Sequence, residues 1–366
     1  MKKSIGIALV LGAGMVSTNA SAAKLVAGEH ARANMTYTTI DQVESSRTSE
    51  YSGVGSIFIS TRSTATTGFG GICTASLIGS GSVLTAAHCL ETDANDPITN
   101  IRLFLPSLGD RSGAREVFTV SEFAIHPDYA ETGLVGGNDI AGLKITGDTS
   151  AYDKYELYLG NPLQQFTAVG TGTIGGPAGT GIGIAGQDYR KREGNNVYEL
   201  FGDQLFSDVG SGVVLYDFDD GTAEHDVFGR NLGLNGLGVE NEAAASPGDS
   251  GGPSFINGQI AAVTSFGITG GIFQGYCGDD STDPFNRAGL TTRTALNQCT
   301  NSSVGEIGGN TLVSANIDFV QGFLDGTVET MAPVPEPSTW LMMLAGFAFV
   351  GGSMRRRPKT VKPVMA

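Results

Sequence analysis

The sequence predicts a protein built mainly of β-strands, on two observations. Short β-prone runs at residues 76–78 and 83–85 flank a polar Gly-Ser turn, which is the pattern of a hairpin. Residues 140–145 partly alternate apolar and polar side chains, as a strand does, although Gly142 weakens the pattern. About 300 residues lie between the two chain ends, enough for one large or two small domains.

A serine with two partners is the main chemical signal. Residues 248–253 read GDSGGP, residues 85–89 read TAAHC, and residues 138–140 read NDI. A serine hydroxyl is a poor nucleophile until a base removes its proton, and a carboxylate must orient that base. The serine motif also fits the G-x-S-x-G pattern of α/β-hydrolases, but there the order is Ser, acid, His, whereas His88 and Asp139 precede Ser250 here. A glycine-rich turn remains the structural alternative in a chain with 54 glycines.

The TAAHC and GDSGGP blocks, in this order, resemble the trypsin/chymotrypsin-type serine proteases over roughly residues 54–326. Weaker matches follow the same order: IHPDY at 125–129, GTG at 170–172 and SFG at 265–267, where the family usually has a tryptophan in place of phenylalanine. The resemblance implies an all-β fold of two six-stranded antiparallel β-barrels with the site in the cleft between them. It also implies a closing C-terminal helix, which fits the helical spacing of apolar residues at 313–324.

The resemblance also assigns chemical roles. Ser250 would attack the scissile carbonyl, His88 would accept and return the proton, and Asp139 would orient His88. The N–H groups of Gly248 and Ser250 would form the oxyanion hole. Three further histidines lack the flanking motif and are interpreted as structural: His30, His126 and His225.

Substrate specificity is expected to depend on a pocket before the serine. Ala244 stands six residues before Ser250, where trypsin-like members carry an aspartate, so cleavage after Lys or Arg is disfavoured. Gly267 would leave one pocket wall open, and the opposite wall would fall near Gly308, or near Gly289 in another register. Medium or large apolar residues are therefore expected before the scissile bond. The segment that holds the substrate backbone would be Ser265, Phe266 and Gly267.

Asp249 needs a counter-charge if it is buried. In the resembled family it pairs with an amino terminus released by cleavage, and Lys24 followed by Leu25 resembles such a junction. Leu25 lies further from Cys73 than is usual in the family, so a flexible arm at residues 23–53 is the alternative to a short propeptide.

The N-terminus predicts export. Residues 1–22 combine two lysines, an apolar stretch and small residues before a cut, which is the pattern of a signal peptide for signal peptidase. Export permits disulfides: the resemblance implies Cys73 with Cys89, which leaves Cys277 with Cys299. A zinc site is the rival interpretation of four cysteines, but no C-x-x-C is present, so we expect neither a metal nor a cofactor.

The C-terminus predicts sorting. A linker at 327–338 holds the sequence VPEPS, and residues 339–366 hold a short apolar stretch followed by three arginines. This resembles the PEP-CTERM signal of Gram-negative bacteria, which implies an exosortase-type processing enzyme and a protein that is released or attached to the surface. A retained membrane anchor is the alternative.

The net charge of −15 opposes nucleic-acid binding. The acidic run 217–221 lacks a full calcium loop and is interpreted as a solvated hairpin turn. Two functions therefore remain: a secreted serine endopeptidase acting on polypeptides, and a surface or matrix protein that uses the same scaffold for binding.

Overall fold

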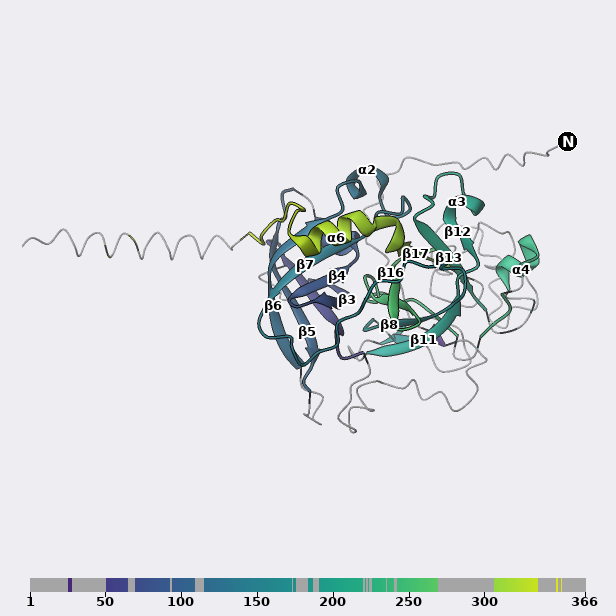
Figure 1. Cartoon of the computed structure of the whole chain (residues 1–366), viewed down its shortest axis with the longest axis horizontal. Coiled ribbons are helices and arrows are strands. Elements are labelled where there is room, and N and C mark those ends of the chain that lie inside the picture. The colour runs from purple at the N-terminus through teal and green to yellow at the C-terminus, as the bar shows by residue number, and fades with distance from the viewer. Residues whose placement is uncertain are drawn as a thin grey trace, which may run out of the picture.

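The computed structural model describes residues 26–27, 51–64, 70–92, 94–108, 115–172, 174–175, 184–186, 191–219, 221, 223, 226–234, 236–239, 242–268, 306–334, 347 and 350. The predicted signal peptide, the Lys24–Leu25 junction, Cys277, Cys299 and nearly all of the sorting tail lie outside these residues. Two curled β-sheets stand side by side, and a helix near the C-terminus packs on the first of them (Figure 1).

The first sheet is a closed barrel with the strand order β2-β3-β4-β7-β6-β5. Its strands are β2 (Val54–Thr61), β3 (Gly71–Gly79), β4 (Ser82–Thr85), β5 (Ile98–Pro106), β6 (Arg115–Ile125) and β7 (Ala141–Thr146). Ile57, Leu77 and Leu103 are among the fully buried side chains that fill it. The predicted hairpin is present, with Leu77 opposite Val83 and Gly81 at a φ of 75°, a value that favours glycine.

The second sheet has seven strands in the order β11-β8-β15-β16-β17-β13-β12. They are β8 (Gln165–Gly170), β11 (Arg192–Val197), β12 (Leu200–Phe201), β13 (Val213–Phe218), β15 (Pro253–Ile256), β16 (Gln259–Ile268) and β17 (Glu306–Leu312). The all-β fold class is confirmed. The second sheet differs in detail from the expected six-stranded barrel, because its pairings among the described residues leave it open between β11 and β12.

Short elements connect and flank the two sheets. Two small pairs are β1 (Val26–Ala27) with β14 (Ala243–Ala244) and β9 (Ile174–Gly175) with β10 (Ile184–Gly186). The short helices are η2 (Ala87–Leu90), α2 (Tyr129–Thr132), α3 (Gly202–Leu205), α4 (Val227–Leu232) and η3 (Ser314–Asn316). The N-terminal segment is thus joined by β1 to the strand that precedes the GDSGGP motif.

Helix α6 (Ile317–Asp325) is the predicted C-terminal helix, beginning after the 3-10 turn η3. It buries Phe319, Val320 and Phe323 in an apolar cluster to which both sheets contribute. A β-carbon on Gly142 would come within 2.6 Å of the Phe323 ring. The glycine that weakens the strand pattern is therefore where β7 makes room for the helix.

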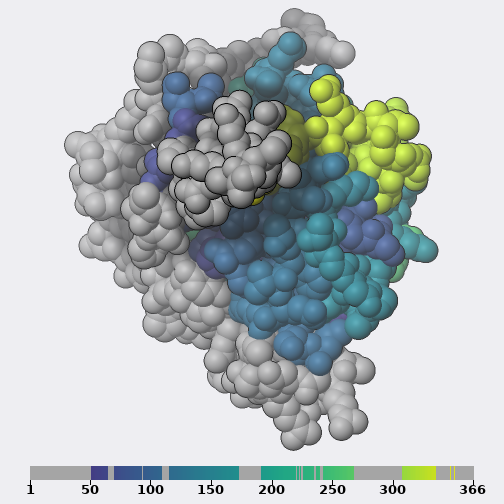
Figure 2. Space-filling view, turned by 90° about the vertical axis from the view of Figure 1, so that its left-hand side faces the viewer, coloured from purple at the N-terminus to yellow at the C-terminus, as the bar shows by residue number. Residues whose placement is uncertain are grey.

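The C-terminal strap, residues 327–334, covers most of the predicted linker and follows the barrel wall. Met331 and Phe123 of β6 exchange backbone hydrogen bonds of 2.7 and 2.8 Å, and the Val334 N–H donates to the Ile98 carbonyl of β5 at 2.8 Å. In Figure 2 the yellow atoms of the C-terminal segment lie directly on the blue atoms of the barrel. No helix in the described part of the chain is long and apolar enough to cross a membrane.

The described carboxylates of the acidic run 217–221, at the end of β13, do not lie in a solvated turn as expected. Asp217 and Asp219 are only 2 % and 0 % exposed. Asp217 accepts hydrogen bonds from the N–H groups of Val227 and Phe228, and Asp219 accepts from Gly221 and Gly238. These carboxylates are buried because they bind the backbone of neighbouring loops, a partner that sequence patterns do not reveal.

Candidate active site

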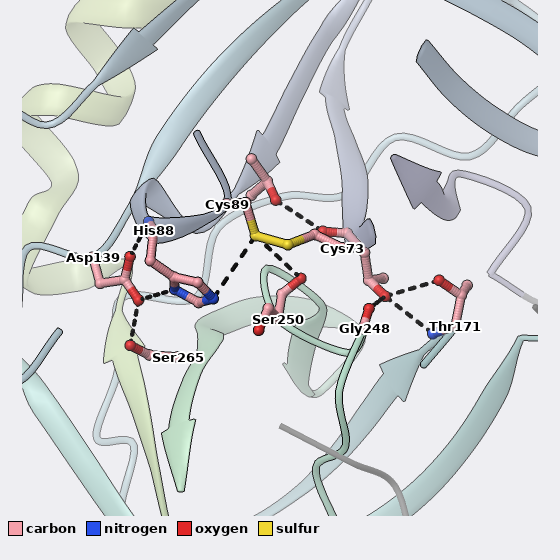
Figure 3. Close-up of a disulfide and its surroundings, with 10 residues drawn as sticks. Cys73, His88, Cys89, Asp139, Thr171, Gly248, Ser250 and Ser265 are labelled. Atoms are coloured by element: carbon pink, nitrogen blue, oxygen red, sulfur yellow. Dashed lines mark hydrogen bonds and ion pairs between the residues drawn. A yellow bond between two sulfur atoms is a disulfide. The ribbon is translucent and has the colours of Figure 1, made fainter. Parts of the chain in front are cut away.

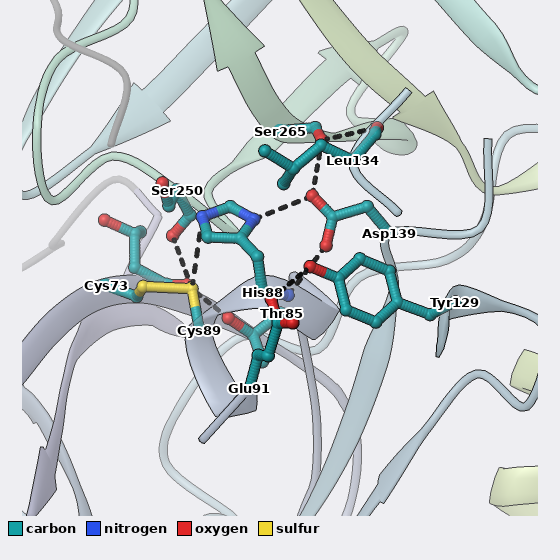
Figure 4. Close-up of polar contacts among 11 residues, drawn as sticks. Cys73, Thr85, His88, Cys89, Glu91, Tyr129, Leu134, Asp139, Ser250 and Ser265 are labelled. Atoms are coloured by element: carbon teal, nitrogen blue, oxygen red, sulfur yellow. Dashed lines mark hydrogen bonds and ion pairs between the residues drawn. A yellow bond between two sulfur atoms is a disulfide. The ribbon is translucent and has the colours of Figure 1, made fainter. Parts of the chain in front are cut away.

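His88 and Asp139 meet at the end of the first barrel that faces the second sheet (Figure 4). Helix η2 follows β4 directly and carries His88, while Asp139 lies two residues before β7. His88 Nδ1 is 2.7 Å from Asp139 Oδ2, and the His88 backbone N–H donates to Asp139 Oδ1 at 2.8 Å. The carboxylate therefore favours the tautomer with a proton on Nδ1, which leaves the Nε2 lone pair free.

Asp139 is completely buried and has a third hydrogen-bond donor. The Ser265 hydroxyl of β16 donates to Asp139 Oδ2. Sequence comparison placed Ser265 in the segment expected to hold substrate backbone, so its contact with the carboxylate was not foreseen. A buried carboxylate is tolerated when several donors bind it, and Asp139 has three.

Tyr129 in α2 is a second neighbour of this pair, to which the sequence analysis assigned no role. Its side chain lies beside Asp139 in Figure 4, and its hydroxyl donates to Glu91 Oε2 at 2.9 Å. Burial, followed by the negative charge of Asp139, raises the pKa of Tyr129 well above its usual range. Tyr129 therefore remains a neutral donor beside the His88–Asp139 pair.

Ser250 sits in a tight turn between β14 and β15 (Figure 3). Gly248 and Gly251 have φ values of 102° and 79°, which glycine adopts without strain. The turn is fixed by three backbone bonds of 2.8 Å: Thr74 N–H to the Ser250 carbonyl, Gly251 N–H to Thr264, and Gly252 N–H to Asp249. The Ser250 Oγ is buried and makes no hydrogen bond among the described residues.

The structure brings Ser250 close to His88 through a disulfide. Cys73 and Cys89 are bonded, the pair that the resemblance implied. Cys89 Sγ lies 3.9 Å from His88 Nε2 and 3.8 Å from the Ser250 carbonyl oxygen. The ring nitrogen and the serine turn therefore flank the same sulfur, from opposite sheets of the molecule (Figure 3).

The N–H groups of Gly248 and Ser250 take part in none of the backbone hydrogen bonds formed between described residues. Thr74 positions the neighbouring peptide, because its hydroxyl donates to the Gly248 carbonyl at 2.8 Å. Nothing in the sequence singles out Thr74 except its place beside Cys73.

Asp249, between Gly248 and Ser250, is buried. Its Oδ1 accepts from the Gly172 N–H at 2.7 Å, and its Oδ2 accepts from the Ser246 N–H at 2.9 Å. The expected junction residues, Lys24 and Leu25, lie outside the described residues, but Val26 pairs with Ala244, five residues before Asp249.

The expected pocket residues lie on the paired strands β16 and β17 and on the separate short strand β14. Gly267 of β16 is directly opposite Gly308 of β17, so these two glycines face each other in the register that sequence reasoning preferred. A β-carbon on Gly267 would touch none of the described residues within 4 Å, whereas one on Gly308 would lie 2.0 Å from the Tyr216 ring. Ala244 and Phe266 are buried, at 7 % and 6 % exposed. Gly289 lies outside the described residues.

Of the rival histidines only His126 is described. Its ring packs against Phe319 of α6 with centroids 4.9 Å apart, and its Nδ1 accepts from the Asp128 N–H at 3.2 Å. Burial lowers its pKa. These contacts fit the structural role expected for it.

The chain is similar to known proteins in its sequence family and among solved structures. The Trypsin family model matches residues 42–277, and the PEP-CTERM protein-sorting motif matches residues 333–357. Among solved structures, HL collagenase is 17 % identical with a TM-score of 0.48, covering 75 % of this chain and 94 % of the other. The scabies mite inactivated protease paralogue S-D1 is 15 % identical with a TM-score of 0.45, covering 76 % and 94 %. The chain belongs to the trypsin family and carries a PEP-CTERM sorting motif at its C-terminus.

Proposed function

We propose that the protein is an exported serine endopeptidase that cleaves polypeptides through Ser250, His88 and Asp139. The observation that carries the proposal is the buried His88–Asp139 pair, whose free Nε2 and the Ser250 turn lie on either side of Cys89 Sγ. Ser250 Oγ would turn toward Nε2, and this rotation breaks no existing bond because the hydroxyl has no partner among the described residues. Catalytic hydrogen bonds are often completed only when substrate binds.

The chemistry follows from these positions. His88 Nε2 takes the Ser250 proton as Oγ attacks the substrate carbonyl, and Asp139 stabilises the imidazolium that forms. The N–H groups of Gly248 and Ser250 bind the developing oxyanion, each donor typically contributing about 3 kcal/mol to transition-state stabilisation. His88 then protonates the leaving amine, and water hydrolyses the acyl-enzyme by the same route.

The pocket argues for apolar substrates. Ala244 offers no charge for Lys or Arg, and Gly267 leaves open space on its side of the strand pair. We infer a preference for medium or large apolar residues before the scissile bond. A peptide library tests this inference, and a cleavage profile dominated by Arg or Lys would contradict it.

Export and sorting belong to the same proposal. Residues 1–22 would be removed by signal peptidase, and an exosortase-type enzyme would process the tail for release or surface attachment in a Gram-negative bacterium. The domain limits proposed from the sequence are 54–326 for the protease and 339–366 for the tail. Cleavage before Leu25 would release an amino terminus near Asp249, an idea supported by the Val26–Ala244 pairing. Sequencing the mature N-terminus tests it.

Labelling with a fluorophosphonate probe tests catalysis directly. We expect the processed protein to be labelled, and Ser250→Ala and His88→Ala to abolish labelling. Ser121→Ala, at an exposed serine of β6, is the matched control and should keep it. Labelling that persists in Ser250→Ala would overturn the proposal. Absence of labelling in folded, processed protein would favour the alternative, a binding protein on a protease scaffold.

A further inference from the structure

Three potential metal ligands meet at the disulfide beside His88. The sulfurs of Cys73 and Cys89 and a ring nitrogen of His88 all lie within 4.8 Å of one another, with Cys73 and His88 buried and Cys89 partly buried. Cys89 Sγ is 3.9 Å from His88 Nε2 (Figure 3). In tetrahedral zinc sites, bond lengths of about 2.3 Å to sulfur and about 2.0 Å to nitrogen place such donors about 3.5 Å apart. The separation of Cys89 Sγ and His88 Nε2 is thus within a few tenths of an ångström of that of two zinc ligands, while Cys73 and Cys89 are bonded in the structure and their sulfurs would separate on reduction.

The surroundings of His88 also match those of a metal ligand. Histidines that bind zinc usually donate their second ring N–H to a carboxylate, which fixes the tautomer and makes the free nitrogen more basic. Asp139 Oδ2 occupies that position, 2.7 Å from Nδ1. Two thiolates would neutralise the charge of a divalent ion, and a neutral complex suits a site where Cys73 is 5 % and His88 8 % exposed.

We propose that the reduced form of this site binds zinc through Cys73, Cys89 and His88, and that oxidation to the disulfide releases the metal. A dithiol reductant supplies two electrons and two protons to the S–S bond and leaves as its own disulfide. Zinc then displaces one proton from each thiol and accepts the Nε2 lone pair. A disulfide oxidant reverses the reaction: it accepts the two electrons with two protons from water and leaves as its own dithiol, while the two sulfurs join again and two of the three protein ligands are lost.

The inference has a consequence for activity, and this part alone rests on the proposed function. While Nε2 donates its lone pair to the metal, it cannot accept the Ser250 proton. The dithiol form with zinc would therefore be inactive, and formation of the Cys73–Cys89 bond would both expel the inhibitor and restore the base. The same two cysteines would act first as ligands and then as a cross-link.

Cobalt provides the direct test, because tetrahedral Co²⁺ with thiolate ligands has characteristic visible and charge-transfer absorption. The experiment uses the protein with Cys277→Ser and Cys299→Ser, which removes the two other thiols. It is reduced with a phosphine, desalted without oxygen and titrated with Co²⁺. We expect one equivalent of tetrahedral, thiolate-bound Co²⁺ that Zn²⁺ displaces, and no such absorption in the oxidised protein.

Variants locate the site. His88→Ala should weaken Co²⁺ binding by at least about tenfold, and Asp139→Asn by about 10–100-fold, the usual effect of losing a partner of a metal ligand. His126→Ala is the matched control and should bind as the parent does. Equal affinity in His88→Ala and the parent would overturn the proposal, as would a reduced protein that keeps its circular dichroism but binds no Co²⁺.

Unfolding of the reduced protein is also informative. A site of this kind adds its binding free energy to folding, so Zn²⁺ should restore the native circular dichroism of any chain that reduction unfolds. Failure of Zn²⁺ to do so would equally refute the site. Fluorophosphonate labelling of the oxidised protein tests the proposed protease function separately. If the reduced protein binds zinc but the oxidised protein is not labelled, the metal site is supported and the protease function is contradicted.

Discussion

The exchange Asp139→Asn tests the catalytic geometry most sharply, because it keeps the size of the side chain and changes only its donors and acceptors. Asp139 Oδ1 accepts the His88 backbone N–H, while Oδ2 accepts from Ser265 and pairs with His88 Nδ1. An asparagine has one oxygen and one NH₂ to serve the same positions. The amide oxygen can therefore face either the His88 backbone N–H or His88 Nδ1, but not both.

Keeping the oxygen toward the His88 backbone satisfies that donor and turns the NH₂ toward Nδ1. Nδ1 then becomes the acceptor, so the proton moves to Nε2, the nitrogen that should receive the Ser250 proton. The opposite orientation places the NH₂ against the backbone N–H and leaves a buried donor unpaired, which costs about 1–3 kcal/mol. The first orientation is favoured, and the variant should carry the wrong tautomer.

The expected loss is about 10⁴-fold in kcat, as for the same exchange of the triad aspartate in a well-studied serine protease. This loss corresponds to an increase of about 5.5 kcal/mol in the activation barrier. Labelling rates with a fluorophosphonate and kcat/KM for a peptide substrate measure it, with thermal unfolding to verify the fold. Asp128→Asn, at an exposed aspartate, is the control and should be unchanged. An Asp139→Asn enzyme within tenfold of the parent would refute the reasoning.

Two further predictions concern stability. Gly142→Ala places a methyl group 2.6 Å from the Phe323 ring. This overlap should lower the free energy of unfolding by about 1–3 kcal/mol and the Tm by several degrees. An unchanged Tm would show that helix α6 shifts to make room at no cost. Burial raises the pKa of Glu199 to about 9, of Asp217 to about 7 and of Glu242 to about 9, with help from neighbouring carboxylates. The folded state therefore holds more protons than the unfolded state above about pH 4.5, so stability should fall as the pH rises from there toward 9. Thermal unfolding at several pH values tests this prediction. Glu199→Gln should make the fall of Tm with pH less steep. A Tm that rises over this range would contradict the prediction.

The parts of the site that the sequence predicted are those encoded in short contiguous blocks. His88 and Ser250 stand in motifs whose neighbours build the local turn, such as Gly248 and Gly251 with their positive φ values. Because the proposed nucleophile and base are adjacent in the chain to the residues that build their turns, a short sequence pattern predicts both.

The contacts that escaped prediction join distant segments. Ser265 reaches Asp139 across 126 positions, and the Thr74 hydroxyl reaches the Gly248 carbonyl across 174. Serine and threonine are common in strands and turns, so nothing marks which of them will meet a buried partner. The buried Asp217 escaped for a similar reason, since its partners are backbone N–H groups that carry no sequence signature.

The C-terminal strap connects the removal of the sorting tail with the stability of the first barrel. The sorting motif begins at residue 333, yet Val334 already donates a hydrogen bond to Ile98 in the wall of the barrel that carries His88. The first residues of the sorting motif are thus also part of the folded domain. An enzyme that cut at the first residue of the motif would remove Val334 and its hydrogen bond to Ile98. An enzyme that cut after Val334 would keep this bond to the barrel wall. Where the tail is severed therefore also decides how well the remaining protein is held together.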